Sequence, residues 1–138
     1  MASSDSHFGP AVDVGHIVMS NGVKLPRFGL GTFLASDSEQ LKTALRAALN
    51  AGYRYIDTAA LYENEYVIGD VLQEYYDAGK LKRSDLFLAT KLPFYGHEHP
   101  DHFINESLKQ LRTDYLDLYI IHMSFPCKVG FLLRSEEM

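Results

Sequence analysis

Four residues in this chain have side chains that could together move a proton: Asp57, Tyr62, Lys91 and His122. Three of them interrupt runs that are otherwise apolar, YRYIDTA, LFLATKL and LDLYIIH, and each lies at the carboxyl-terminal end of its run. If the runs are parallel strands, their carboxyl ends share one rim, where the active sites of α/β folds gather. We therefore expect the three side chains at one rim, with Tyr62 close enough along the chain to reach over it.

The chemistry open to these groups follows from their acidities. A phenol with a pKa of about 10 is a weak acid at neutral pH, but an adjacent ammonium stabilises the phenolate. Lys91 can do this for Tyr62, and the carboxylate of Asp57 can keep Lys91 protonated. A neutral imidazole at His122 can donate a hydrogen bond that orients and polarises a carbonyl oxygen. This is the proton-transfer half of a carbonyl reduction, and the hydride must come from a nicotinamide cofactor because no side chain supplies one.

Each of the four residues also has an ordinary structural explanation. Asp57 could cap the turn into the next helix, and Lys91 could extend its ammonium into solvent from a strand end. A single histidine on a strand, such as His122, is more often a core residue than a catalyst. Tyr62 is one of nine tyrosines and could serve packing alone. An acid, a lysine and a histidine at the ends of successive strands are chemically complementary, which favours an active site over coincidence.

The segments that must position these residues alternate between two patterns. Apolar runs RFGLGTF, YRYIDTA, LFLATKL and LDLYIIH recur about every 30 residues from residue 27 onward, which is the size of one strand-helix-strand unit. The runs are apolar nearly throughout, as in parallel strands covered on both faces. Before them, two short apolar runs flank Asn21-Gly22, which predicts a β-hairpin with positive φ at both turn residues. The fold class is therefore α/β with a parallel sheet.

Three amphipathic helices are expected between the four strands. Ser36 with Glu39 forms a capping-box pattern at the start of the first, and Gly52 suits the left-handed position after its end. The second is expected from about Glu63 to about Gly79. The third begins at Pro100, since proline is well tolerated in a first helical turn.

The composition excludes several classes of protein. A net charge of −5 argues against a nucleic acid or an anionic membrane surface as partner. The sequence contains no run of about eighteen apolar residues, so no membrane span is expected. The single cysteine, Cys127, cannot form a disulfide within the chain, so we expect a reducing, cytoplasmic setting. Residues 1–15 are predicted to be a flexible tail. The polar cluster at 97–102 is predicted to be a surface loop, and no metal site is expected.

A family resemblance becomes specific at residues 52–69. The run GYRYIDTAALYENEYVIG resembles a signature segment of the aldo-keto reductases, and FGLGTF, LATKLPF and YLDLYIIH resemble that family's first, third and fourth strands. The resemblance extends over residues 16–126. It implies a (β/α)8 TIM barrel and an oxidoreductase that reduces aldehydes or ketones to alcohols with NADPH.

The resemblance also implies roles for the four residues of the opening. Tyr62 would be the proton donor, Lys91 and Asp57 the pair that activates it, and His122 the residue that orients the substrate. Tyr62 and His122 would also contact the substrate, and Asp57 would lie beside the cofactor.

Further residues are assigned by the same resemblance to the first strand-end loop. Gly31, Thr32 and Phe33 match the loop that touches the nicotinamide end of NADPH, and Phe33 would also line the substrate pocket. Phe33 and Met123 stand where tryptophan is common in the family, and Pro93 stands where an aromatic residue is common. The pocket is therefore expected to differ in shape from that of many relatives.

The length of the chain fits only part of such a barrel. A (β/α)8 barrel needs about 250 residues, whereas these 138 residues supply a hairpin, four strands and three helices, with a divergent end over residues 127–138. The family's main NADPH-binding segments, in its later units, have no counterpart here. Two open sheet edges would invite self-association. An alternative is thus an inactive half-barrel that acts through a partner chain, and a third is a structural or channel-associated relative.

Overall fold

The computed structural model describes residues 8–125. The elements follow in this order: β1 (His16–Val18), β2 (Lys24–Pro26), β3 (Leu30–Gly31), α1 (Ser38–Asn50), β4 (Tyr55–Asp57), the short 3-10 helix η1 (Ala60–Tyr62), α2 (Glu65–Asp77), a second 3-10 helix η2 (Arg83–Asp85), β5 (Phe87–Leu92), α3 (Pro100–Leu111) and β6 (Leu118–Ile121). The predicted end segment, 127–138, lies outside the described residues. Of the predicted tail, residues 8–15 are described.

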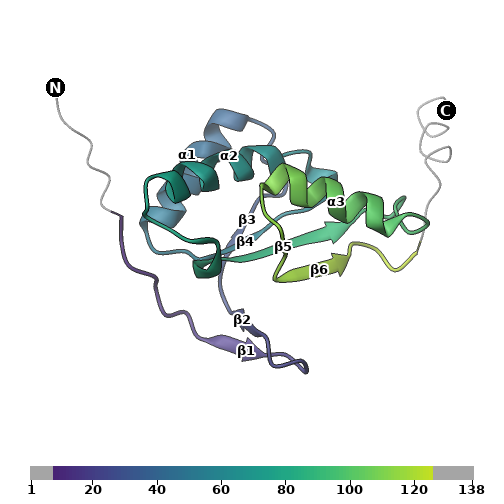
Figure 1. Ribbon diagram of the computed structural model, residues 1–138, viewed down its shortest axis with the longest axis horizontal. Helices are drawn as coiled ribbons and strands as arrows, with labels where there is room; N and C mark the ends of the chain where they lie inside the picture. The colour runs from purple at the N-terminus through teal and green to yellow at the C-terminus, as the bar shows by residue number, and fades with distance from the viewer. Residues whose placement is uncertain (1–7, 126–138) are drawn as a thin grey trace.

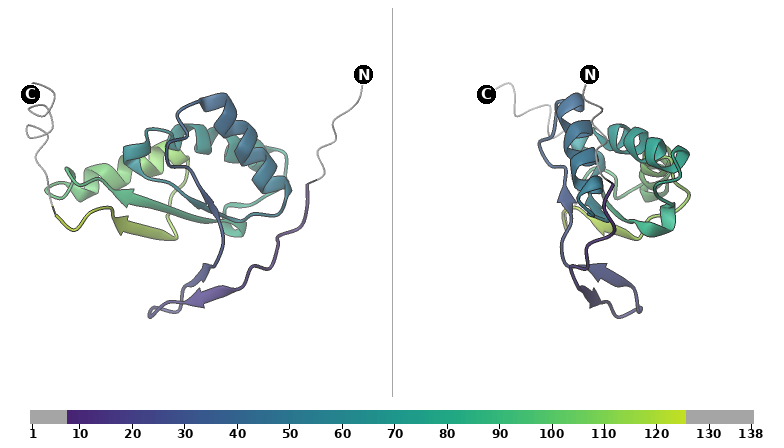
Figure 2. Two further views of the ribbon diagram at one scale, coloured as in Figure 1. Left: turned by 180° about the vertical axis from the view of Figure 1, so that it is seen from behind. Right: turned by 90° about the vertical axis from the view of Figure 1, so that its left-hand side faces the viewer.

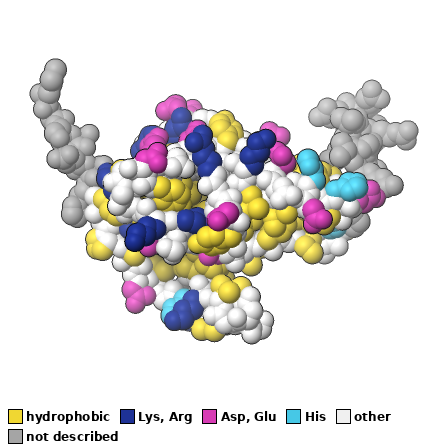
Figure 3. All heavy atoms as spheres, viewed as in Figure 1, with side chains coloured by type: hydrophobic (Ala, Val, Ile, Leu, Met, Phe, Trp, Pro, Cys, Tyr) yellow, Lys and Arg dark blue, Asp and Glu magenta, His cyan; other side chains and the backbone are white. Residues whose placement is uncertain are grey.

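The main sheet has four parallel strands in the order β3-β4-β5-β6, and β1 and β2 form a separate antiparallel hairpin. Helices α1, α2 and α3 lie together over one face of this sheet, and the hairpin extends from its other side (Figures 1 and 2). Charged side chains are scattered over the helical layer, and hydrophobic surface lies between that layer and the hairpin (Figure 3). The predicted α/β architecture, with a hairpin, four parallel strands and three helices, is confirmed.

The core fills the space between the helices and the sheet. Leu45 and Leu49 of α1, Ile68 and Leu72 of α2 and Leu88 of β5 are almost completely buried in it. Successive side chains of a strand point to opposite faces. The strand residues that pack against the helices are mostly apolar, and the alternate positions of each strand face away from the helices.

Two strand positions show this alternation where it matters for chemistry. Ile56 of β4 is packed into the helix-side core, so its neighbour Asp57 points to the opposite face. Thr90 of β5 bonds to a side chain of α2, so Lys91 points the same way as Asp57. Asp57 pairs with Ala89, which precedes Lys91 by two residues on the same face of β5, so the side chains of Asp57 and Lys91 lie close together.

The hairpin is present, but the prediction for its turn is wrong. β1 ends at Val18 and β2 starts at Lys24, so residues 19–23 form a longer connection than a two-residue turn. Gly22 has a φ of 84°, whereas Asn21 is not among the residues with positive φ. The side chain of Asn21 accepts a hydrogen bond from the Val23 N–H at 3.1 Å. This local contact stabilises the connection in place of a second left-handed residue.

The predicted cap of the first helix is also displaced by one residue. Asp37, not Ser36, is the N-cap of α1, and its Oδ1 accepts from the backbone N–H groups of Glu39 and Gln40 at 3.0 Å each. A carboxylate at this position accepts hydrogen bonds from two free N–H groups of the first turn, and its negative charge interacts favourably with the positive end of the helix dipole. At the other end, Gly52 takes a φ of +97°, as predicted.

The second helix starts later than predicted. η1 carries Tyr62, Glu63 takes a left-handed φ of 53°, and α2 begins at Glu65. A residue with positive φ cannot continue a right-handed helix, so the chain turns at Glu63. The third helix begins at Pro100, as predicted. Tyr62 is consequently held on a short turn between β4 and α2 and not in the long helix.

Candidate active site

The Nζ atom of Lys91 connects three groups at the carboxyl end of the sheet. It donates to Oδ1 of Asp57 at 2.6 Å, to the backbone carbonyl of Thr58 at 2.8 Å and to the phenol oxygen of Tyr62 at 3.2 Å. An ammonium has three protons, so every donor of Lys91 is used. Its side chain is 13% exposed and that of Asp57 is 30% exposed. The ion pair is therefore only partly open to solvent, and it holds the ammonium directly beside the phenol.

His122 lies beside the same phenol. It directly follows β6, and its backbone N–H donates to the carbonyl of Leu92 at 3.1 Å. Its ring is 5.7 Å from that of Tyr62, at an interplanar angle of 84°. Among the described residues, its buried Nδ1 has no hydrogen-bond partner.

The surroundings of His122 favour its neutral form. Burial lowers the pKa of the imidazole, the charge of Lys91 lowers it further, and the carboxylate of Asp57 opposes the change. A neutral imidazole keeps one N–H donor, so this ring can donate a hydrogen bond at neutral pH without carrying a positive charge.

The loop after β3 borders the same rim. Gly31 ends β3, and the N–H of the buried Thr32 donates to the carbonyl of Asp57 at 3.1 Å. The ring of Phe33 lies 5.2 Å from that of Tyr62, at 56°. The structure thus brings all the residues predicted for catalysis, cofactor binding and substrate binding to one end of the sheet.

Two contributors to this cluster were not predicted. The phenol of Tyr55 donates to the second carboxylate oxygen of Asp57 at 3.4 Å. Tyr55 precedes Asp57 by two residues, and strand alternation could have placed both on one face. The other contributor is the backbone carbonyl of Thr58, which accepts from Lys91. A backbone carbonyl has no signature in the sequence, so only the fold could reveal it.

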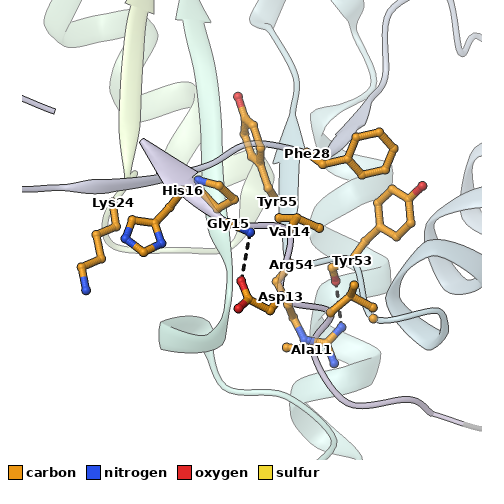
Figure 4. Close-up of a pocket in the computed structure, with 13 residues that line it drawn as sticks. Ala11, Asp13, Val14, Gly15, His16, Lys24, Phe28, Tyr53, Arg54 and Tyr55 are labelled. Carbon is orange, nitrogen blue, oxygen red and sulfur yellow. Dashed lines mark hydrogen bonds between the residues drawn. The ribbon is translucent and has the colours of Figure 1, made fainter. Parts of the chain in front are cut away.

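A hollow of about 450 Å³ lies at the opposite end of β4 (Figure 4). It is lined by the segment 11–16, the hairpin and residues 52–55, with Phe28, Tyr53 and Tyr55 as aromatic walls. None of Asp57, Tyr62, Lys91 or His122 lines it. We locate the site at the carboxyl rim because the convergent reactive groups are there, whereas the hollow is defined by shape alone.

Within residues 8–125, no group of three or more histidine, cysteine or carboxylate side chains could hold a metal ion. The polar segment 97–102 therefore does not assemble such a site. In the same part of the chain, no helix combines the length and the apolar character needed to cross a membrane.

Comparison with known proteins gives this arrangement a context. Residues 27–135 match the model of the aldo/keto reductase family. The chain belongs to this family. An aldose reductase of Encephalitozoon cuniculi (strain GB-M1) is 44% identical over 104 residues, which are 75% of this chain and 35% of that relative. A methylglyoxal reductase of Escherichia coli (strain K12) is 41% identical over 110 residues, which are 80% of this chain and 38% of that relative.

Solved aldo-keto reductase structures have the same fold. The aldose reductase of Schistosoma japonicum matches with a TM-score of 0.75 and 40% identity, over 82% of this chain and 38% of that one. An aldo-keto reductase of Bombyx mori, solved in complex with NADP, matches with a TM-score of 0.80 and 35% identity, over 87% of this chain and 41% of that one. The barrel prediction is confirmed, and this aldo-keto reductase chain spans well under half the length of these relatives.

Proposed function

We propose that this chain carries the proton-transfer machinery of an NADPH-dependent reduction of aldehydes or ketones to alcohols. The observation behind the proposal is the contact of one ammonium, that of Lys91, with both Asp57 and Tyr62. The methylglyoxal reductase and aldose reductases among its relatives support carbonyl compounds as the substrate class.

Tyr62 is the proposed proton donor. When hydride reaches the carbonyl carbon, negative charge develops on the oxygen, and the phenol passes its proton to that oxygen. The phenolate that remains is stabilised by Lys91 at 3.2 Å. The carboxylate of Asp57 balances the charge of Lys91, which offsets the cost of holding the ammonium in a partly buried position.

His122 is the proposed orienting residue. Its ring stands edge-on to Tyr62, so an oxygen bound in front of the phenol is also within reach of the imidazole. Because the pKa of His122 is lowered by burial and by Lys91, the ring donates a hydrogen bond as a neutral group. It thereby polarises the carbonyl without competing with Tyr62 as the acid.

The described rim fits the nicotinamide end of the cofactor. A Cβ added at Gly31 would meet nothing within 4 Å, so the backbone there is open to a flat ring. Gly31, Thr32 and Phe33 would border that ring, beside Asp57, and Phe33 would also contact the substrate. The nicotinamide, when bound, supplies the hydride.

The test uses the purified 138-residue chain. The chain should oxidise NADPH in the presence of a simple aldehyde, which is measured as a fall in NADPH absorbance. Tyr62→Phe should abolish this oxidation. Tyr66→Phe is the matched control, because the exposed Tyr66 on α2 bonds only to Ser38 among the described side chains. A folded wild-type chain that neither binds nor oxidises NADPH would refute the proposal.

The alternative function is supported by a separate observation. The sheet of the described residues has β3 and β6 as its edges, and it is covered by helices on one face only. Ile121 of β6 and Phe125 beyond it are largely exposed. Unpaired edges and apolar surface favour association, so we propose self-association or binding of another barrel fragment. Size-exclusion chromatography should show dimers or larger species, and a compact monomer would contradict this.

A further inference from the structure

Asn64 has an unusual place between the two loops that border the candidate site. It is the N-cap of α2, and its backbone carbonyl accepts from Val67 and Ile68 in the usual way. An asparagine at this position commonly uses its side chain to accept from the first turn of its own helix. Asn64 makes no such bond, and its side chain reaches toward another part of the chain.

The side chain of Asn64 spans the loop after β3. Its Nδ2 donates to the carbonyl of Thr32 at 2.9 Å and to the carbonyl of Ala35 at 3.2 Å. These two carbonyls bracket Phe33 and Leu34. The amide therefore uses both of its protons to hold the backbone on either side of Phe33.

The other end of the amide holds the loop after β4. Oδ1 of Asn64 accepts from the hydroxyl of Thr58 at 3.2 Å, and the hydroxyl of Thr32 donates to that of Thr58 at 3.0 Å. Thr32, Thr58 and Asn64 are 1%, 2% and 4% exposed. The network is buried and its members satisfy each other, so it fixes the two loops as one unit.

Both loops need such a restraint. Leu34 has a φ of 60° and Glu63 a φ of 53°, and neither is a glycine. The left-handed conformation costs such residues roughly 1 kcal/mol or more, and the surrounding structure has to maintain it. Phe33 is 67% exposed, so burial does not hold its ring 5.2 Å from Tyr62.

We propose that Asn64 is a positioning residue, which holds Phe33 against Tyr62 by joining the loop after β3 to the loop after β4. This rests on the proposed function only for its catalytic consequence. The amide of Asn64 fixes the backbone on either side of Phe33, and the ring of Phe33 then borders the space beside the phenol of Tyr62. This ring limits the positions that a carbonyl compound can take in front of Tyr62.

The test uses a fluorescent reporter, because the chain contains no tryptophan. Phe33→Trp introduces a single indole at the position whose placement is in question. Asn64→Asp keeps the shape of the side chain but removes both N–H donors. Asn64→Ser removes them too and retains a favourable N-cap for α2, so it stays informative if Asn64→Asp does not fold. Asn105→Asp, on the exposed surface of α3, is the matched control.

In the Phe33→Trp background, both Asn64 variants should make the indole more accessible to acrylamide and shift its emission, while the helical circular dichroism is unchanged. Where the chain turns over, Asn64→Ser should lower kcat/KM by about tenfold to hundredfold. An indole signal that is unchanged, or that changes as much in Asn105→Asp, overturns the proposal. Because fluorescence needs no turnover, a chain without reductase activity would refute the proposed function and leave this test intact.

Discussion

Nζ of Lys91 lies 2.6 Å from Oδ1 of Asp57, in a pair that is 13% and 30% exposed. A partly buried cation that loses its counter-ion keeps the cost of burial and loses the attraction that offset it. This pair therefore matters for both stability and chemistry, and it leads to the first prediction.

Asp57→Asn should lower the free energy of unfolding by about 1–3 kcal/mol, a range reduced from that of fully buried pairs because solvent screens this one. Urea denaturation followed by circular dichroism measures the change. Glu39→Gln is the control, because Lys42 and Glu39 form an ion pair on the surface of α1, and it should lower stability by much less. Equal effects of the two substitutions would show that burial adds nothing to the Asp57 pair.

Lys91→Met should reduce kcat/KM for aldehyde reduction by about 10²-fold or more, because the phenolate of Tyr62 then loses its neighbouring cation. NADPH binding, measured by fluorescence titration, should be much less affected, since Lys91 donates to Asp57, Thr58 and Tyr62. A variant that retains wild-type turnover would remove Lys91 from the mechanism.

His122 should make the protein less stable in acid. Its folded pKa is lowered below the ordinary value of 6.5, chiefly by burial, so the folded state binds its proton less readily than the unfolded state. The contribution of His122 to stability is then fully present above pH about 6.5 and is lost as pH falls through the folded pKa. The free energy of unfolding, measured by denaturation at several pH values between 5 and 8, should depend less on pH in His122→Gln than in the wild type. His99→Gln, at an exposed position, should keep the wild-type slope.

Glu65 should behave in the opposite sense. Glu65 is the first residue of α2, and its buried carboxylate accepts hydrogen bonds from Thr90 of β5 at 2.6 Å and from Ser107 of α3 at 3.0 Å. Burial raises its pKa above the ordinary value of 4.5. Its protonated form is favoured in the folded state, so its contribution is present below the unfolded pKa and is lost as pH rises through the folded pKa. Glu65→Gln should therefore be more stable than wild type at pH 7 and lose this advantage near pH 4. Thermal unfolding at the two pH values checks the prediction, and an equal difference at both would contradict it.

Much of the fold was predictable because it depends on local patterns. Apolar runs gave the four strands, and the position of Asp57 and Lys91 at the ends of two of them placed both at one rim. The displaced cap shows the limit: Ser36 and Asp37 are both good capping residues, and the backbone turn selects between them. Helix boundaries depend on such one-residue choices.

The contacts within the site were less predictable. The role of Asn64 depends on a side chain that reaches the carbonyl of Thr32, 32 residues earlier in the chain. The sequence around Asn64 contains an ordinary helix start, and nothing in it indicates that the side chain is used elsewhere. Interactions between distant loops become visible only when the sheet has brought those loops together.

The order of the strands in the sheet, β3-β4-β5-β6, is the same as their order along the chain. Each strand therefore pairs with the one that precedes it, and none must be inserted between two that are already joined. Partner residues in neighbouring strands, such as Leu30 and Ile56, are separated by a single strand-helix unit. No pairing therefore has to close a longer loop, which limits the entropy cost of each step. During synthesis, the sheet can grow from β3 to β6 as each strand leaves the ribosome.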